Sequence, residues 1–391
     1  MTSMRRVRIL AVVGVASVVL AACSDQEQDV FTPEGDYSEK INRLQVPVFI
    51  IAGVVGVLVA VLLTMAIVSG IRRRKDDDDE PVQLEGNFKL EIAWTIAPAV
   101  LLAAIAVFTV GTLMQLDDAG ADNPEGMEIT VYGQQWWWAY EYDLDPDAHN
   151  GPEIVTANDL VIPAGVPISL QIRSRDVIHS FWIPALAGTR DAVPGRTHHI
   201  VLEADEPGVY DGQCKEYCGL SHANMRARAV ALSESEFATW LDEQQEQAPM
   251  LAEGDVGYDG QQLFLARCTS CHQIDGLEIN GEPLDVRDSA NLVSRHAPNL
   301  THLMSRGVFA GALFDLWITD DQGRPVVNRT QLEAWLRDPP GQKPMYSEPA
   351  EGELPRGMPN LELSESEIDQ IVTYLETLGA EPPIQTAEGS N

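Results

Sequence analysis

Residues 212–225 read Gly-Gln-Cys-Lys-Glu-Tyr-Cys-Gly-Leu-Ser-His-Ala-Asn-Met, which places Cys214, Cys218, His222 and Met225 in one short loop. His179 lies upstream of this loop. Two thiolates, two imidazoles and a thioether favour a soft or borderline metal, copper before calcium or magnesium. A mononuclear blue-copper site needs only one cysteine, so the second cysteine of the loop is the informative addition.

Three other interpretations of the loop remain open. The cysteines could form a disulfide if the compartment is oxidising. The two cysteines and two histidines could hold a structural zinc ion. The residues could also be unrelated members of a core. Met225 has no role in the disulfide or the zinc interpretation.

The loop lies in a region, residues 126–241, that is rich in predicted strands. Turn sequences such as Asp145-Pro146 and Pro194-Gly195 separate short apolar segments. Short strands at this spacing predict an all-β sandwich or barrel. The expected strands are 128–132, 136–142, 168–174, 198–203 and 227–232.

A second motif, Cys268-Thr-Ser-Cys271-His272, follows a polar segment at 242–257 that reads as a linker. Cys-x-x-Cys-His is the attachment signature of c-type haem, in which both thiols bind the haem and the histidine is an iron ligand. A thioredoxin-like redox pair is disfavoured by the adjoining histidine and by the lack of a β-α-β pattern. We therefore expect a haem-binding domain at 258–380.

The second iron ligand should come from later in the chain, and a methionine there gives a high potential. Met358 is our choice because it directly precedes an amphipathic helix whose N-cap is Ser364, with Glu367 at the capping-box position. Small class I cytochromes c end in this way. The alternatives are Met345, Met304 and His302.

Two long uncharged runs, 46–71 and 92–116, each exceed the length needed to cross a bilayer as a helix. The basic run 72–75 follows the first of them. Because Lys and Arg determine sidedness, the loop 72–91 is expected in the cytoplasm. The segment 23–45 and everything after Leu116 are then expected outside, so the chain is a transmembrane hairpin carrying a large extracytoplasmic part.

The first 22 residues read as a secretory signal, with a basic start and a short apolar stretch. The ending Leu20-Ala21-Ala22-Cys23 resembles a bacterial lipobox, which would make Cys23 the lipidated first residue of the mature chain. An ordinary signal peptide with an incidental cysteine is the alternative.

The net charge of −33 argues against a nucleic-acid partner, because phosphate affinity needs clustered Lys and Arg. It equally argues against docking to anionic lipid through a polybasic patch. Both extracytoplasmic regions carry net negative charge, so we do not expect gross attraction to dock them. The covalent linker would instead supply a high effective concentration.

Three segments together resemble cytochrome c oxidase subunit II: 135–142 with its three tryptophans, 176–184 around His179, and 212–225. The resemblance implies a cupredoxin-like all-β domain followed, in this chain, by an all-α class I cytochrome c domain. It also implies that Cys214 and Cys218 bridge two coppers in a binuclear CuA centre, that His179 and His222 each cap one copper, and that Met225 and the Glu216 carbonyl complete the site.

Further roles follow from the same resemblance. The Glu216 side chain matches a magnesium ligand at the interface with subunit I, and Trp136 matches an electron-entry tryptophan. Three consecutive tryptophans cannot all face one side of a strand, so we expect at least one of Trp136–Trp138 at the periphery. Glu91 falls where the family places the mouth of a proton pathway; by sequence alone it is a charge at a membrane border.

The resemblance implies an electron-transfer subunit of a terminal haem-copper oxidase in the bacterial plasma membrane. Cytochrome c or a cytochrome bc complex would donate electrons to its haem c. The electrons would then pass through CuA to subunit I, where oxygen is reduced to water with coupled proton translocation. The complex would include other oxidase subunits. The alternatives are the CuA subunit of a nitric oxide reductase and a membrane-anchored electron carrier without a catalytic partner.

Overall fold

The computed structural model describes residues 28–73, 85–116, 126–148, 151–279, 281–283, 297–346 and 356–382 of the chain. The expected signal segment with Cys23, and residues 74–84 of the expected cytoplasmic loop, lie outside these ranges.

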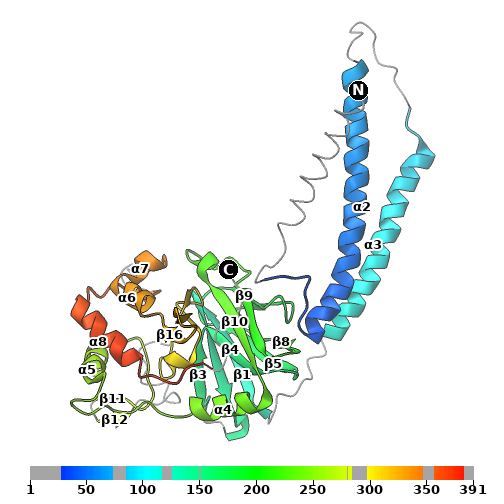
Figure 1. Ribbon diagram of the computed structural model, residues 1–391. Coiled ribbons are helices and arrows are strands. Elements are labelled where there is room, and N and C mark those ends of the chain that lie inside the picture. The colour runs from blue at the N-terminus through cyan, green and yellow to red at the C-terminus, as the bar shows by residue number, and fades with distance from the viewer. Residues whose placement is uncertain are drawn as a thin grey trace.

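Two long helices form the predicted hairpin. Helix α2 spans Asp36–Arg73 and α3 spans Phe88–Leu116, and the two lie side by side in opposite directions (Figure 1). Both are long and apolar enough to cross a membrane, with mean hydropathies of 3.0 and 2.3, and their large apolar side chains are exposed. Apolar exposure of this extent is expected of surfaces that face lipid.

Helix α2 begins before the predicted span, and its first turn is fixed to the β region. The Ser38 hydroxyl donates to the Ala185 carbonyl at 2.6 Å, and the Glu34 amide donates to the same carbonyl at 2.8 Å. The Asp205 amide donates in turn to the Glu34 carbonyl at 2.8 Å. The start of the hairpin is therefore tied by hydrogen bonds to two connecting loops of the β region.

The β region, from here on called the copper module after the metal that its loop is predicted to bind, is a sandwich of two sheets with strand orders β3-β2-β1-β5-β8 and β4-β10-β9. Side chains in β5 alternate between buried and partly exposed, and Ile168, Leu170 and Ile172 are fully buried in the core. This alternation is what a strand with one face on a core requires. The strands are β1 Glu128–Gln134, β2 Trp137–Asp143, β3 Ile154–Ala157, β4 Asp159–Pro163, β5 Ile168–Ser174, β6 His179–Trp182, β7 Thr189–Ala192, β8 His198–Leu202, β9 Gly208–Gln213 and β10 Arg226–Leu232.

The five predicted strands are confirmed as β1, β2, β5, β8 and β10, with ends that differ by up to two residues. Strands β3, β4, β6, β7 and β9 were not predicted. Short 3-10 helices η2 (Pro146–Ala148) and η3 (His222–Asn224) lie in connections, and helix α4 (Glu234–Gln244) follows β10. Helix α4 ends just inside the predicted linker.

The C-terminal region, from here on the cytochrome module, is built on helices α5 (Tyr258–Arg267) and α8 (Glu365–Leu375). Their rings Phe264 and Tyr374 pack 5.6 Å apart. A Cβ at Gly260 would lie 2.0 Å from the Gln370 carbonyl, so only glycine permits this close crossing. The other elements are β11 Glu278–Ile279, β12 Glu282–Pro283, η4 Leu303–Ser305, β13 Val308–Phe309, β14 Phe314–Asp315, β15 Trp317–Thr319, β16 Pro325–Val327, α6 Arg329–Arg337 and α7 Pro339–Gln342.

The start of α8 confirms a local prediction. Ser364 is the N-cap, and its side chain accepts from the Glu367 amide while the Glu367 carboxylate accepts from the Ser364 amide. The predicted apolar stripe of the helix is buried, including Ile368, Ile371 and Val372.

The copper module lies between the hairpin and helices α5–α8 (Figure 1). The two modules meet at a buried polar contact. The Arg228 guanidinium pairs with both oxygens of Asp159, at 2.7 and 3.0 Å, and the Gly307 amide of the cytochrome module donates to Asp159 at 2.7 Å. A Cβ at Gly307 would lie 1.9 Å from Arg228, so the contact requires glycine. The modules are thus packed against each other as well as joined by the chain.

Candidate functional site

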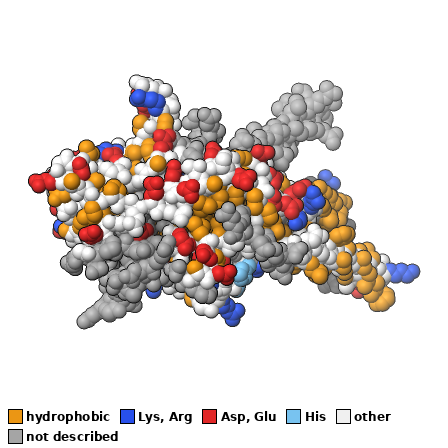
Figure 2. All heavy atoms as spheres, turned by 90° about the horizontal axis from the view of Figure 1, so that it is seen from below, with side chains coloured by type: hydrophobic (Ala, Val, Ile, Leu, Met, Phe, Trp, Pro, Cys, Tyr) orange, Lys and Arg blue, Asp and Glu red, His pale blue; other side chains and the backbone are white. Residues whose placement is uncertain are grey.

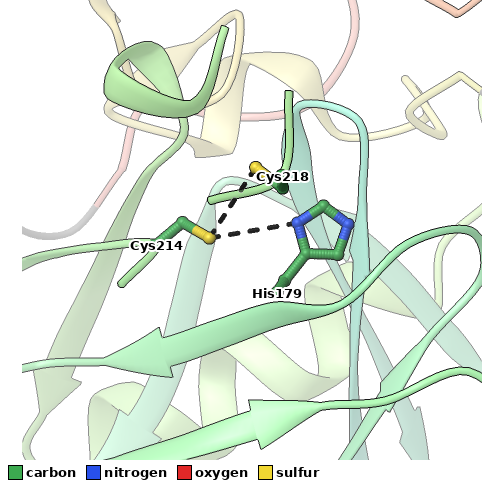
Figure 3. A group of neighbouring side chains, drawn as sticks. All are labelled: His179, Cys214 and Cys218. Atoms are coloured by element: carbon green, nitrogen blue, oxygen red, sulfur yellow. Dashed lines mark hydrogen bonds between the residues drawn. The ribbon is translucent and has the colours of Figure 1, made fainter. Parts of the chain in front are cut away.

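The two cysteines of the 212–225 loop lie side by side at one end of the sandwich. Their sulfurs are 3.9 Å apart and both side chains are buried (Figure 3). A disulfide needs about 2.05 Å, so the two thiols are free. The disulfide interpretation is therefore not the one that the structure adopts.

All the other donors predicted for this site gather around the cysteines. His179, on β6, points its Nδ1 at the Cys214 sulfur, 3.9 Å away, and the Glu216 carbonyl lies 3.3 Å from the same sulfur. The His222 Nδ1 and the Met225 sulfur lie 3.5 and 3.8 Å from the Cys218 sulfur. His179 comes from β6, whereas the other donors come from the loop after β9. The fold thus brings a residue distant in sequence next to this loop.

The composition of this cluster fits copper. Two sulfurs, two imidazole nitrogens and a buried thioether are soft or borderline donors. A four-coordinate zinc site would leave the Met225 sulfur unused. The group His179, Cys214 and Cys218 has its donor atoms within 4.8 Å of one another.

The Cys214 thiol of the cluster loses its proton readily. The hydrogen bond with Cys218 lowers the pKa of the Cys214 thiol to about 4, and His179 acts in the same direction. Thiolate is the form of cysteine that binds metals, so Cys214 is biased toward the ligand state, whereas the same contact and burial raise the pKa of the Cys218 thiol.

Asp176 lies behind His179 and is a candidate site residue that was not predicted from the sequence. Its carboxylate accepts from His179 Nε2 at 2.8 Å and from the Gln135 amide at 2.7 Å. Burial opposes protonation of His179, yet the hydrogen bond to Asp176 raises the pKa of that imidazole. The contact holds Nδ1 of the ring toward the sulfurs. Carboxylates commonly orient metal-binding histidines in this way. The three-residue spacing between Asp176 and His179 was the available signal.

The three tryptophans correct one expectation. Trp136, Trp137 and Trp138 are all buried, with exposures of 1%, 8% and 0%. Trp138 faces the sandwich core, where it packs on Phe181. Trp136 belongs to the same buried cluster as Trp138, whereas Trp137 lies in a separate cluster with Ala139 and Ala157. Trp136 and Trp137 both line a cavity of the cytochrome module, which covers the expected periphery.

Trp136 touches both modules. Its indole N–H donates to the Cys218 carbonyl at 3.1 Å, and its ring packs 5.3 Å from the Tyr346 ring of the cytochrome module. One side chain therefore connects the cysteine cluster to the second module.

Beside Trp136 lies an apolar cavity of about 410 Å³ in the cytochrome module. Cys268, Cys271 and His272 line it, together with Met345 and Met358. The segment 297–302 contributes Ala297, Pro298 and Leu300 to the lining. The motif and both leading methionine candidates thus converge on one space.

The tautomer and the pKa of His272 suit a metal ligand. Its Nδ1 lies 2.9 Å from the Pro298 carbonyl, which can only accept, so Nδ1 carries the proton and Nε2 keeps its lone pair. Burial lowers the pKa of His272 and favours the neutral ring that binds metals. Among the described residues lining the cavity, neither Met304 nor His302 is present.

Arg306 supplies the test of whether this cavity suits a haem. It lines the cavity with only 2% of its surface exposed. One nitrogen donates to the Asn299 carbonyl at 2.5 Å, whereas Nε and Nη1 have no partner among the described residues. A buried cation with unused donors is costly unless an anion joins it. Haem carries carboxylates and an apolar ring, so the lining fits it.

The remaining predicted site residues lie elsewhere. Glu91 is exposed in the first turn of α3, and the Glu216 side chain is exposed on the metal loop. Within the described part of the chain, neither carboxylate contacts the cysteine cluster or the cavity. The roles predicted for both carboxylates would therefore need a partner subunit.

Comparison with known proteins matches the whole architecture. Family models described as "Cytochrome C oxidase subunit II, transmembrane domain", "Cytochrome C oxidase subunit II, periplasmic domain" and "Cytochrome c" match residues 28–111, 127–231 and 258–311.

Three relatives illustrate the similarity. "Cytochrome c oxidase subunit 2" of Alkalihalophilus pseudofirmus is 31% identical over 93% of this chain and 94% of its own length. The protein of the same name from Bacillus subtilis is 30% identical over 96% of this chain and 98% of its length. "Quinol oxidase subunit 2" of Bacillus cereus is 29% identical over 60% of this chain and 78% of its length.

The role of Asp176 is open to test. Asp176→Asn removes the charge that orients His179, so we expect copper affinity to fall about 10–100-fold. The affinity is measured by chelator competition on the detergent-solubilised full chain. Asp147→Asn, an exposed carboxylate in η2, is the matched control. Equal affinity in Asp176→Asn and the control would refute the role.

Proposed function

This chain belongs to the cytochrome c oxidase subunit II family, and from that premise we propose that it receives electrons at its cytochrome module and passes them through the cysteine cluster to subunit I. One observation carries the proposal: the cavity lined by Cys268, Cys271 and His272 also has Trp136 in its wall, and Trp136 is hydrogen-bonded to the Cys218 carbonyl.

The proposed ligands follow from the contacts described above. Copper would be held by the donor set His179, Cys214, Glu216 carbonyl, Cys218, His222 and Met225. Haem would be attached through Cys268 and Cys271, with His272 and Met358 as the iron ligands and Arg306 opposite a carboxylate. When bound, the two groups supply reversible one-electron redox chemistry.

The chain's own residues provide short distances and a low dielectric between the two sites. Trp136 is 1% exposed and excludes water from the interface. Its indole N–H and its ring contacts fix its orientation between the loop of Cys218 and the cavity. Fixed geometry of this kind reduces the reorganisation that accompanies transfer.

The setting in the cell forms part of the proposal. Helices α2 and α3 would span the bacterial plasma membrane, with the copper and cytochrome modules on the outer face and the loop 72–91 in the cytoplasm. Residues 1–22 would be removed and Cys23 lipidated. The proposed divisions are 23–45, 46–71, 92–116, 126–241, 242–257 and 258–380, as expected from the sequence.

Subunit I would carry out the reduction of oxygen and the coupled proton translocation. The exposed Glu216 carboxylate would face subunit I and bind magnesium there, and Glu91 would stand at a proton entry. A cytochrome c or a cytochrome bc complex is the proposed donor, since a chain with its own haem-binding module presents a protein-accessible entry for electrons.

The acceptor is tested on the purified membrane complex. We expect the chain to co-purify with a haem-bearing membrane subunit, and the complex to consume oxygen when a reduced cytochrome c is supplied. Consumption of nitric oxide in preference to oxygen would indicate a nitric oxide reductase. Isolation of the chain without such a subunit would indicate a simple electron carrier.

The path through Trp136 makes a kinetic prediction. Trp136→Phe removes the N–H that contacts Cys218, so we expect electron transfer from the cytochrome module to the cysteine cluster to slow at least about tenfold, equivalent to 1.4 kcal/mol in the barrier. Rapid photoreduction followed by absorbance measures the rate. Trp240→Phe, in the sandwich core beside Tyr142, is the control. A wild-type rate in Trp136→Phe would exclude the role.

The choice of Met358 over Met345 is tested by a matched pair, because both side chains line the cavity. Met358→Leu removes the proposed thioether ligand, so the haem midpoint potential should fall by more than about 0.1 V. Met345→Leu should leave the potential close to that of the wild type. Redox titration of the haem absorbance distinguishes the two, and the reverse pattern would assign Met345 instead.

A further inference from the structure

Lys343 is a buried cation between the two modules. It follows helix α7 and is 2% exposed. Its ammonium donates to the Trp136 carbonyl at 2.6 Å and to the Ala310 carbonyl at 2.7 Å. The first acceptor belongs to the copper module and the second to the cytochrome module, so one amine joins both.

The burial of Lys343 is expensive. Among the described residues, no carboxylate lies within ion-pair distance of its nitrogen, so two carbonyl dipoles alone replace its water. Desolvation lowers the pKa of this lysine to about 7. An apolar side chain would fill such a space at lower cost, so the position of the amine calls for a role beyond packing.

The contact around Lys343 is shaped for it. Gly311 has φ +78°, and a Cβ there would lie 2.4 Å from the Lys343 nitrogen and 2.5 Å from the Trp136 carbonyl. The Gly311 amide donates to Asn158 at 3.1 Å, and its carbonyl accepts from the Arg226 amide at 3.0 Å. Thus the segment that holds one acceptor of Lys343 is itself bonded to the copper module on both sides.

We propose that Lys343 is a positioning residue that fixes the cytochrome module against Trp136. Electrons then pass between the two modules in one docked arrangement, and the cytochrome module does not have to find its position by moving on the linker. The inference deepens the proposed function and rests on it. It also replaces the expectation that the linker alone brings the modules together.

The test uses Lys343→Met in the full chain within its complex. Methionine keeps most of the side-chain volume and removes the two N–H donors. Hydrogen exchange of the Gly311 and Arg226 amides reports docking, because both are bonded across the interface. We expect their exchange to rise at least about tenfold, while the Cys268 amide, bonded within the cytochrome module, keeps its protection.

Electron transfer should change together with docking. We expect the rate from the cytochrome module to the cysteine cluster to fall at least about tenfold in Lys343→Met. The visible and near-infrared spectra and the KM for the donor should stay unchanged. Lys40→Met, a lysine paired with Asp36 in α2 and far from the interface, is the control and should change neither readout.

Unchanged exchange at Gly311 and Arg226 in Lys343→Met, or a wild-type transfer rate, would overturn the inference. If that variant loses its haem spectrum, Lys343→Gln takes its place, because glutamine keeps a polar end in the buried space while it removes the ammonium that donates to both carbonyls. The same increase in exchange and loss of rate are expected, and their absence overturns the inference. A wild-type chain without any transfer between the modules would refute the proposed function instead, while the exchange data would still decide the role of Lys343.

Discussion

The position of Trp136 is the constraint on which the arrangement of both modules depends. Its indole N–H is bonded to the Cys218 carbonyl, its own carbonyl accepts from Lys343, and its ring packs on Tyr346. A shift of this residue would therefore alter the metal loop and the wall of the cavity together. The same contacts keep water out of the space between the two sites, where a low dielectric strengthens every polar contact.

Docking of the two modules does not depend on their overall charge. Acidic side chains are spread over the surface, as Figure 2 shows for one face, and the chain as a whole carries −33. Like charges of this kind repel weakly at physiological salt. Attraction comes from a few buried polar contacts, among them the bond from the Gly307 amide to Asp159 of the buried Asp159–Arg228 pair. Such contacts fix one geometry, whereas diffuse charge would allow many.

Much of this site could be predicted because most of its candidate ligands lie in short sequence motifs. The loop 212–225 and the Cys268–His272 motif place their ligands within a few residues, and the capping box at Ser364 is equally local. The burial of all three tryptophans could not be predicted, since it depends on a second module covering the sheet. Lys343 and Arg306 carry no local signal either, because their partners are backbone carbonyls brought together only by the tertiary fold. Strands β6 and β9 were missed for a related reason: β6 has four residues and β9 contains Gly208 and Gly212, so pairing rather than propensity holds them.

The central proposal is that the cysteine cluster holds two coppers and the cytochrome module one haem. Metal analysis of the full chain, purified in detergent without its partner subunits, tests this directly. The predicted content is two coppers and one iron per chain, and Cys214→Ser should lose both coppers together because each thiolate would bridge them. A single copper, or zinc in its place, would contradict the account.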